Sequence, residues 1–395
     1  MQDWQNGGFG VYVHWPFCES KCPYCDFNSH VSQEIDQQAW LQAYLKCLDD
    51  AAQKISPRLL NTVFFGGGTP SLMSPDIVSE IINKIKSLWL VSNDLEITLE
   101  ANPSSVEAVK FTDYQAAGVN RLSIGVQALN NSDLTRLGRL HSVEEAIKAV
   151  EISNSIFKET SLDLIYARQD QTIDQWSAEL KRAIELETTH LSLYQLTIEH
   201  GTAFGNLYKK GKLNGLPSDD HAASLYEVTQ DLCDKYNLTA YEISNHSKPK
   251  SESKHNLIYW KYGDYLGIGP GAHGRVTINN KKMATEAERN PDKWLSAVTN
   301  EEIYEYVTTI APLDQAKEYI LMGLRISEGI SLSRLDSICD HKIKDDNISH
   351  LTEIGLITLS NDRLSVNANG RLVLNRIIDK PVSYTHLTLP TILRV

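Results

Sequence analysis

The sequence predicts an α/β protein: a partial (β/α)6 barrel followed by a small C-terminal winged-helix-like α+β domain. From about residue 10 to residue 200, short β-branched runs alternate with longer amphipathic stretches, a pattern typical of βα units with a parallel sheet. Six such units are two fewer than a closed eight-fold barrel contains. The chain has 395 residues and is 42% hydrophobic, so it can bury a sizeable core.

Six runs are expected as parallel strands: Gly10–His14, Thr62–Gly66, Leu95–Leu99, Arg121–Val126, Ser161–Tyr166 and His190–Leu196. Helical periodicity marks the stretches between and after them: Ile35–Lys54, Pro75–Leu88, Val106–Ala117, Val143–Asn154 and Ile173–Leu186. In parallel sheets of this kind, ligands bind beyond the carboxyl ends of the strands. The loops that follow the strands are therefore where we look for a site.

The second half of the chain is less regular. It is expected to hold a helix at Ser218–Tyr236 capped by Ser218, a tight loop at Gly263–Gly274, helices at Leu313–Ile326 and Leu332–Cys339, a hairpin of Leu356–Leu359 with Arg363–Val366, and a helix at Ala368–Ile378. We divide the chain into a core at 1–240, a glycine-rich closing segment at 241–310, the winged-helix-like domain at 311–380 and a tail at 381–395. The tail is uncharged until Arg394, and we interpret it as non-native sequence.

Charge and hydropathy exclude several classes of function. Lys and Arg total 38 against 50 Asp and Glu, a net charge of −12, which argues against a broad nucleic-acid-binding face. No run approaches the length of a transmembrane helix. The N-terminus lacks a basic segment followed by an apolar one, so we expect no secretory signal and a cytoplasmic location.

Three of the six cysteines, Cys18, Cys22 and Cys25, lie close together directly after the first expected strand. Thiolates are the usual ligands of iron–sulfur clusters. Three of them on one loop can hold one side of a [4Fe–4S] cluster and leave the fourth iron open to an exogenous ligand. The alternative is a structural zinc site with His14 or His30 as the fourth ligand. The other cysteines, Cys47, Cys233 and Cys339, are expected to be small buried side chains.

The segment from Tyr12 to His30, with its CxxxCxxC motif, resembles the radical S-adenosylmethionine (SAM) superfamily. Within that superfamily it is similar to the oxygen-independent coproporphyrinogen-oxidase-like family. The resemblance extends from Tyr12 to Ile378. It implies that Cys18, Cys22 and Cys25 bind a [4Fe–4S] cluster and that SAM binds its open iron.

The same resemblance implies a set of SAM-contacting residues, each near the end of an expected strand. They are Tyr12, Tyr24, Gly67, Gly68, Thr69, Glu100, Gln127, Arg139 and Asp163. From the residues alone, a glycine turn is more often a plain βα connection, and Glu100 could be a solvated or capping acid. The Gly267–Gly271 segment lacks the GxGxxG spacing, and Pro270 interrupts it, so we reject a dinucleotide site there.

Two features favour the heme-chaperone branch of this family over the oxidases. Phe27 stands where the oxidases carry a fourth cysteine, and only 17 residues precede Cys18. The resemblance also covers an HNxxYW motif that is associated with heme, formed by His255, Asn256, Tyr259 and Trp260. An imidazole can ligate heme iron, and Tyr259 and Trp260 offer flat apolar area. The alternative is that these side chains are core anchors.

The expected function is therefore a chaperone that binds heme, a [4Fe–4S] cluster and SAM. We expect it to pass heme to an acceptor protein, with a respiratory-chain haem protein as one candidate. Coproporphyrinogen oxidase activity is not expected. The alternatives are an oxygen-independent coproporphyrinogen III oxidase and a radical SAM enzyme that acts on another substrate.

One loop departs from the family pattern. After the fifth expected strand the family usually has Gly-Leu-Pro-Gly, whereas this chain has Ala167-Arg168-Gln169-Asp170. If the turn needs a positive φ, Ala or Asp would be strained there relative to Gly.

Overall fold

The computed structural model describes residues 2–32, 34–339 and 345–379. The described chain divides into two compact units. The first runs to Ala240 and adds Ser244–Tyr259 and Gly263–Thr309; the second holds Tyr241–Ile243, Trp260–Tyr262 and the chain from Ile310 on. The expected tail at 381–395 lies outside the described residues.

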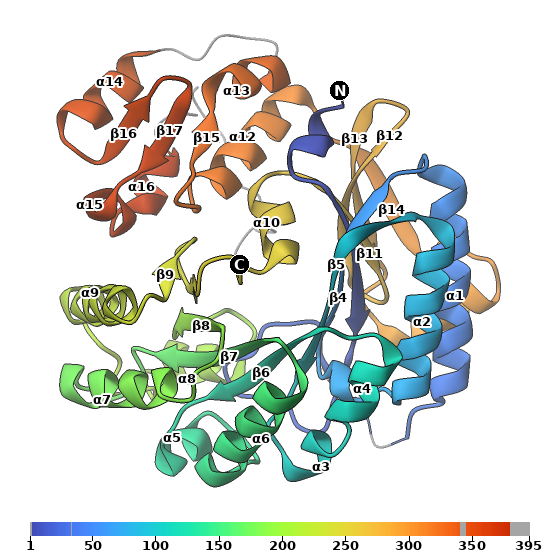
Figure 1. Ribbon diagram of the computed structural model, residues 1–395, viewed down its shortest axis with the longest axis horizontal. Helices are drawn as coiled ribbons and strands as arrows, with labels where there is room; N and C mark the ends of the chain where they lie inside the picture. The colour runs from blue at the N-terminus through green and yellow to red at the C-terminus, as the bar shows by residue number, and fades with distance from the viewer. Residues whose placement is uncertain (1, 33, 340–344, 380–395) are drawn as a thin grey trace. The chain divides into compact units, whose positions relative to one another are not determined.

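The first unit is built on a 12-stranded sheet in the order β14-β13-β12-β11-β1-β4-β5-β6-β7-β8-β10-β9. Its central strands run parallel: β1 (Phe9–Trp15), β4 (Leu59–Gly67), β5 (Leu90–Ala101), β6 (Arg121–Gln127), β7 (Glu159–Tyr166) and β8 (His190–Gln195). All six expected strands are therefore present. Because the sheet curves without closing on itself (Figure 1), the partial barrel is confirmed.

Helices cover the outer face of this sheet, as Figure 1 shows for α1 and α2 beside β4 and β5. The covering helices are α1 (Gln37–Lys54), α2 (Pro75–Leu88), α3 (Ser105–Ala108), α4 (Phe111–Ala117), α5 (Asn131–Arg136), α6 (Val143–Ile156), α7 (Ile173–Ile184) and α9 (Asp219–Lys235). Successive side chains of β1 point to opposite faces. Trp15 packs on Trp40 of α1 with ring centroids 6.0 Å apart, whereas Tyr12, on the opposite face, stacks on Phe64 of the neighbouring strand β4.

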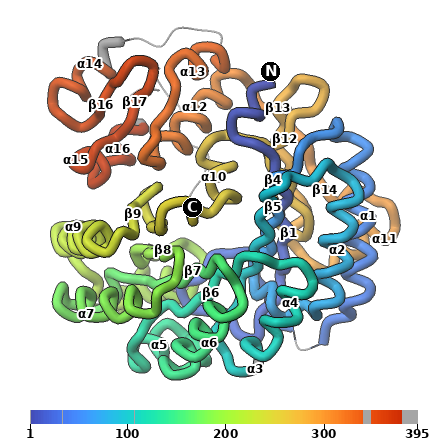
Figure 2. Tube along the Cα trace, viewed as in Figure 1, coloured from blue at the N-terminus to red at the C-terminus, as the bar shows by residue number. Residues whose placement is uncertain are grey.

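Segments that are distant in sequence meet beside β1. The strand β11 (Asp264–Ile268) pairs in parallel with β1, and the later, yellow-to-orange part of the chain lies beside the blue N-terminal strand in Figure 2. The sheet continues through β12 (His273–Ile278), β13 (Lys281–Ala287) and β14 (Glu305–Thr309), with α11 (Pro291–Thr299) before β14. At the other end, β9 (Thr239–Ala240) and β10 (Asn245–Ser247) extend it past β8.

The prediction of a tight loop over Gly263–Gly274 was wrong. Strands β11 and β12 occupy most of that segment, and only a short turn at 269–272 joins them. Gly267 is needed for packing rather than for turning, because a Cβ there would collide with the backbone of His273. Two predicted helices are also broken: 106–117 divides into α3 and α4, and 368–378 into α15 and α16.

The second unit holds three antiparallel strands packed with helices. The strands are β15 (Ile330–Ser331), β17 (Arg363–Val366) and β16 (Ile357–Ser360), and the helices are α12 (Pro312–Gly323), α13 (Leu332–Cys339), α14 (Asp345–Glu353), α15 (Ala368–Arg371) and α16 (Leu374–Asp379). Leu335, Ile357 and Ile377 are buried in its core. This arrangement matches the predicted small α+β domain. Across the described ranges, no helix combines the length and apolarity needed to cross a bilayer.

Candidate functional site

The cysteine loop leaves β1 and is tied at both ends to the barrel. Its start forms β2 (Phe17–Cys18), which pairs with β3 (His30–Val31). The backbone after β4 also anchors it, because Gly68 N–H donates to Trp15 O at 2.7 Å and Thr69 N–H donates to Phe17 O at 2.8 Å. Its far side is held by α8 (Ala203–Lys209), since Phe204 N–H donates to Pro23 O at 2.8 Å.

Two glycines after β4 allow this close approach. A Cβ on Gly67 would lie 2.7 Å from the His14 ring, and Gly67 itself has φ +115°. A Cβ on Gly68 would lie 2.6 Å from Phe17 O and 3.0 Å from Cys18 Sγ. The 2.7 Å approach to the His14 ring and the 2.6 Å approach to Phe17 O are too short for real Cβ contacts. The glycines predicted to line SAM therefore also set the position of the first cysteine, and their N–H groups are engaged within the protein.

The three thiols of the loop are half-buried and unbridged. Burial raises the pKa of Cys18 and of Cys25, and the nearby cysteines raise each further. Arg139 Nη1 donates to Cys22 Sγ at 3.5 Å, which brings a cation against the loop. A group of thiols that repel one another as thiolates is suited to a metal centre that neutralises their charge.

Within the described ranges, no three His, Cys, Asp or Glu side chains converge on one point as ligands of a metal ion would. A [4Fe–4S] cluster makes a different demand, because each thiolate binds a separate iron. Both alternative zinc ligands are hydrogen-bonded within the protein. His14 Nε2 faces Asn28 O at 2.9 Å and its Nδ1 faces the Tyr12 hydroxyl at 2.9 Å, while His30 Nε2 faces Asn28 Oδ1 at 3.2 Å. The donor set therefore fits an iron–sulfur cluster better than the zinc alternative.

Tyr12 and His14 form a short polar chain from the barrel interior to the cysteine loop. Burial lowers the pKa of His14 to about 4, so the ring is neutral. Since Nε2 faces a carbonyl oxygen, it carries the proton, and Nδ1 accepts from the Tyr12 hydroxyl. Burial and then Glu100 raise the pKa of Tyr12 well above its ordinary value. The hydroxyl therefore stays protonated and can donate.

Arg139 connects the cysteine loop to the ends of β5 and β6. Its Nη2 donates to Asn102 Oδ1 at 2.6 Å and to Gly125 O at 2.8 Å, while Nη1 reaches Cys22. Tyr24 also contacts Cys22 and Arg139. The Nε of Arg139 is buried and has no hydrogen-bond partner among the described residues. A buried donor without a partner beside three thiols fits a site that is completed by an anionic ligand group.

Gln127 owes its position to a bulge. It has φ +71°, and the pairing register between β6 and β7 shifts between Gly125 and Gln127. The side chain folds back over the strand, since a Cβ added to Gly125 would lie 2.9 Å from Gln127 Nε2 and 3.7 Å from Arg139 Nη2. Gln127 therefore shares the Arg139 side of the site, as the predicted set requires.

Glu100 and Asp163 face each other across the barrel interior. Burial raises the pKa of Glu100 to about 8, and the charge of Asp163 adds to the shift. Glu100 Oε2 accepts from Gly67 N–H at 3.2 Å. Asp163 accepts from Ser123 at 3.1 Å and from Ser161 at 3.2 Å, and burial raises its pKa as well. Two enclosed carboxyls that accept hydrogen bonds from a backbone amide and from serine hydroxyls suit a ligand with a positive charge or with hydroxyl donors.

The HNxxYW motif lies on α10 (Lys254–Trp260), away from the cysteine loop. His255 is buried, with Nδ1 2.6 Å from Thr62 Oγ1 and Nε2 2.7 Å from the Tyr259 hydroxyl. Its ring stacks on Phe64 at 5.0 Å, and burial lowers its pKa to about 3. Both nitrogens that could bind iron are engaged, so this structure holds His255 as a core residue.

The rest of the motif is also packed. Asn256 is half-buried, and its N–H donates to Ser253 Oγ at 3.3 Å. The Tyr259 ring meets Tyr265 edge-on at 4.4 Å. Trp260 belongs to the second unit, where the guanidinium of Arg325 lies 5.1 Å from its ring centroid. The structure does not bring these four side chains together on an open face.

Asn102 is a site residue that the sequence reasoning missed. Its Oδ1 accepts from Arg139, and its Nδ2 donates to Thr69 Oγ1 at 3.3 Å. It thus links two predicted SAM residues. Its place directly after β5, two residues beyond Glu100, was the signal that could have identified it.

Comparison with known proteins agrees with this geometry. The Radical SAM superfamily matches residues 12–183, and the HemN C-terminal domain matches residues 310–373. Heme chaperone HemW of Escherichia coli (strain K12) is 35% identical over 375 residues, covering 93% of this chain and 97% of that protein. The mitochondrial radical S-adenosyl methionine domain-containing protein 1 of Bos taurus is 33% identical, covering 93% and 86%.

Among solved structures, the coproporphyrinogen III oxidase HemN of Escherichia coli superposes with a TM-score of 0.78. The superposition covers 96% of this chain and 93% of the oxidase, at 21% identity. At that identity the likeness concerns the fold.

Proposed function

The chain belongs to the HemW family of radical SAM proteins, and from that premise we propose that it is a heme chaperone. Its radical SAM domain implies a [4Fe–4S] cluster and SAM. The proposed activity is to bind heme and to pass it to an acceptor protein, with the cluster and SAM as resident cofactors in the cytoplasm.

The observation that carries the cofactor part of the proposal is the Arg139–Cys22 contact at the cysteine loop. We propose that Cys18, Cys22 and Cys25 hold the cluster. When bound, the cluster and SAM supply one-electron chemistry at the SAM sulfonium. Arg139 would orient a carboxylate through its planar guanidinium, and Glu100 and Asp163 would accept hydrogen bonds from ammonium or hydroxyl groups.

The remaining predicted SAM residues are assigned by position. Tyr12 and Tyr24 flank the interior and the cysteine loop, Gln127 lies beside Arg139, and Gly67, Gly68 and Thr69 lie at the carboxyl end of β4 beside the cysteine loop. The N–H groups of all three are already engaged, and Thr69 O accepts from Leu72 N–H at 3.0 Å, so their contribution would come mainly from the space that the two glycines leave.

The heme contact is the least direct part of the proposal. To bind heme iron, the His255 ring must first break its hydrogen bond to Thr62 or its hydrogen bond to Tyr259. The Tyr259 and Trp260 rings would likewise have to leave their contacts with Tyr265 and Arg325 before a porphyrin could lie against them. Binding through this motif therefore predicts a local rearrangement of α10 on heme addition.

The experiment is anaerobic reconstitution of the full chain with iron and sulfide, followed by addition of heme. A chaperone retains about one heme per chain through gel filtration, releases it to an apo-haem protein, and does not turn over coproporphyrinogen III. Turnover of coproporphyrinogen III would support the oxidase alternative. Failure to retain heme would refute the chaperone proposal while leaving the cluster to be tested separately.

A further inference from the structure

The turn between β7 and α7 carries two residues in an unfavourable backbone conformation. Ala167 has φ +56° and Asp170 has φ +58°, in the left-handed region where a Cβ is strained. The turn is nevertheless fixed in place: Ala167 is 1% exposed, and Asp170 N–H donates to Gly215 O at 2.7 Å. Some interaction must stabilise this turn against its backbone strain.

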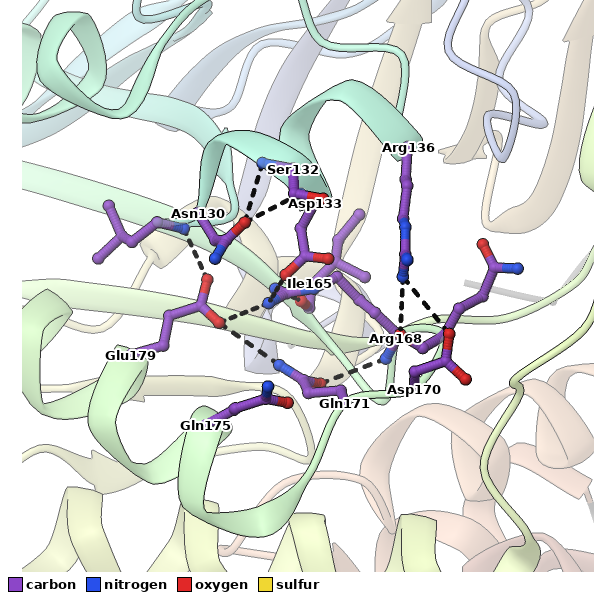
Figure 3. A network of polar contacts seen from close by, with 12 residues as sticks. Asn130, Ser132, Asp133, Arg136, Ile165, Arg168, Asp170, Gln171, Gln175 and Glu179 are labelled. Carbon is purple, nitrogen blue, oxygen red and sulfur yellow. Dashed lines mark hydrogen bonds and ion pairs between the residues drawn. The ribbon is translucent and has the colours of Figure 1, made fainter.

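Arg168 supplies stabilising interactions. The residue is 4% exposed and lies between two carboxylates (Figure 3). Its Nη2 is 3.0 Å from Asp133 Oδ2 and 2.5 Å from Glu179 Oε2. Its Nη1 donates to Ile165 O at 2.6 Å, and Gln171 Oε1 accepts from its backbone N–H at 3.2 Å. A planar guanidinium can meet several acceptors in this way, whereas a lysine ammonium has a different geometry.

Glu179 links Arg168 to the turn that follows β6. This residue of α7 uses its second oxygen, Oε1, to accept from Leu129 N–H at 2.6 Å. Leu129 lies two residues after Gln127, at the end of the turn that follows the β6 bulge. Glu179 therefore fixes the backbone that sets where the Gln127 side chain points.

Asp133 links Arg168 to helix α5, which precedes Arg139 and the contact with the cysteine loop. It lies on α5, whose end turns directly into Gly138 and Arg139. Arg139 N–H donates to Leu134 O at 2.9 Å, and a Cβ on Gly138 would lie 2.6 Å from Pro23. The orientation of α5 therefore determines how Arg139 reaches Cys22.

We propose that Arg168 is a positioning residue for SAM binding, which acts by holding Gln127 through Glu179 and Arg139 through Asp133. The inference rests on the proposed SAM site and adds to it a specific support built from this chain's own strained turn. Arg168 touches neither SAM nor the thiols. Its role is to keep two separate elements, the turn after β6 and helix α5, in register with one another.

The test uses reconstituted full-length protein and the SAM dissociation constant from equilibrium dialysis. Arg168→Leu should raise that constant about tenfold to a hundredfold, the range typical when a residue that orients ligand-contacting groups is lost. Adding Ala167→Gly and Asp170→Gly to that variant should recover part of the melting temperature but not the affinity, because the glycines relieve the strained turn without restoring the contacts to Asp133 and Glu179. The two glycine substitutions alone should leave the constant within about twofold of the parent, since they add no contact.

Arg58→Leu is the matched control. Arg58 is equally buried and pairs with Asp264 at 2.5 Å, at the opposite end of the strands. It should lower the melting temperature and leave the SAM dissociation constant unchanged. If Arg168→Leu does not fold, Glu179→Gln replaces it, since that variant removes the charge facing Arg168 while keeping an acceptor for Leu129. A smaller rise in the constant is then expected, because only the link between Arg168 and Glu179 is weakened.

Unchanged SAM affinity in folded Arg168→Leu or Glu179→Gln, with only a lower melting temperature, would overturn the inference. Recovery of affinity by the two glycine substitutions would show that Arg168 acts through turn strain alone, and would overturn the proposed route through Glu179 and Asp133. If the unmodified reconstituted protein binds no SAM, the proposed function itself fails and this inference falls with it.

Discussion

Replacing Glu100 by Gln should remove most of a pH-dependent loss of stability that the parent protein shows. Burial, reinforced by Asp163, raises the pKa of Glu100 to about 8 in the folded chain, whereas an unfolded glutamate titrates near 4.3. The folded state therefore holds the proton more tightly than the unfolded state. The stability that comes from this tighter proton binding is fully present below the pKa of the unfolded state, and it is lost as the pH rises through about 8.

The magnitude follows from these two values. Each unit of pKa difference is worth about 1.4 kcal/mol, and integration between pH 6 and pH 9 gives a loss of up to about 3 kcal/mol in the free energy of unfolding. Urea unfolding of the cofactor-free protein at both pH values measures this loss in the free energy of unfolding. Glu100→Gln should lose about 3 kcal/mol less than the parent over this interval.

The control is Glu151→Gln, on the exposed face of α6, which should track the parent. If the parent and Glu100→Gln lose the same free energy between pH 6 and pH 9, the carboxyl is not enclosed as described, and the electrostatic account of the barrel interior is refuted.

Three further predictions follow from the site. Serine at Cys18, Cys22 or Cys25 should abolish the iron–sulfur absorbance near 400 nm, whereas serine at Cys47, Cys233 or Cys339 should leave it intact; equal loss in both groups would contradict the assignment. Gly68→Ala should reduce the iron bound per chain at least several-fold, because its Cβ would lie 2.6 Å from Phe17 O and displace Cys18; full iron content would show that the loop tolerates the methyl group. His255→Ala should lower stability by about 2 to 4 kcal/mol, since two buried hydrogen bonds and a stacked ring are lost, and heme retention measured alongside melting distinguishes a packing role from iron ligation.

The order of strands and the helices between them could be predicted because their signals are local. The alternation of β-branched runs with amphipathic stretches identified all six parallel strands, and Ser218 was identified as the cap of α9, where its hydroxyl accepts from His221 N–H. The segment Gly263–Gly274 could not be read in this way. Its glycines serve the close approach of β11 and β12, which only the folded sheet reveals.

The candidate site was predictable where a motif is contiguous and less so where distant segments meet. The cysteine spacing was visible directly, but the partner of His255 is Thr62, 193 residues away, and no local pattern indicates that pairing. A positive φ at this turn was raised only as a condition, from the glycines that the family usually has there, and the structure shows it at Ala167 and Asp170. The Arg168 network that holds the turn depends on Asp133 and Glu179 from two other helices, and so required the structure.

The central claim is that the Cys18–Cys25 loop binds a [4Fe–4S] cluster whose fourth iron is open to SAM. Electron paramagnetic resonance of the anaerobically reduced, reconstituted protein tests it most directly when spectra are recorded with and without SAM. We predict about four iron and four sulfide per chain, as a cubane cluster contains, and a cluster signal that changes when SAM is added. Bound zinc without sulfide, or a cluster signal that SAM leaves unaltered, would contradict the claim.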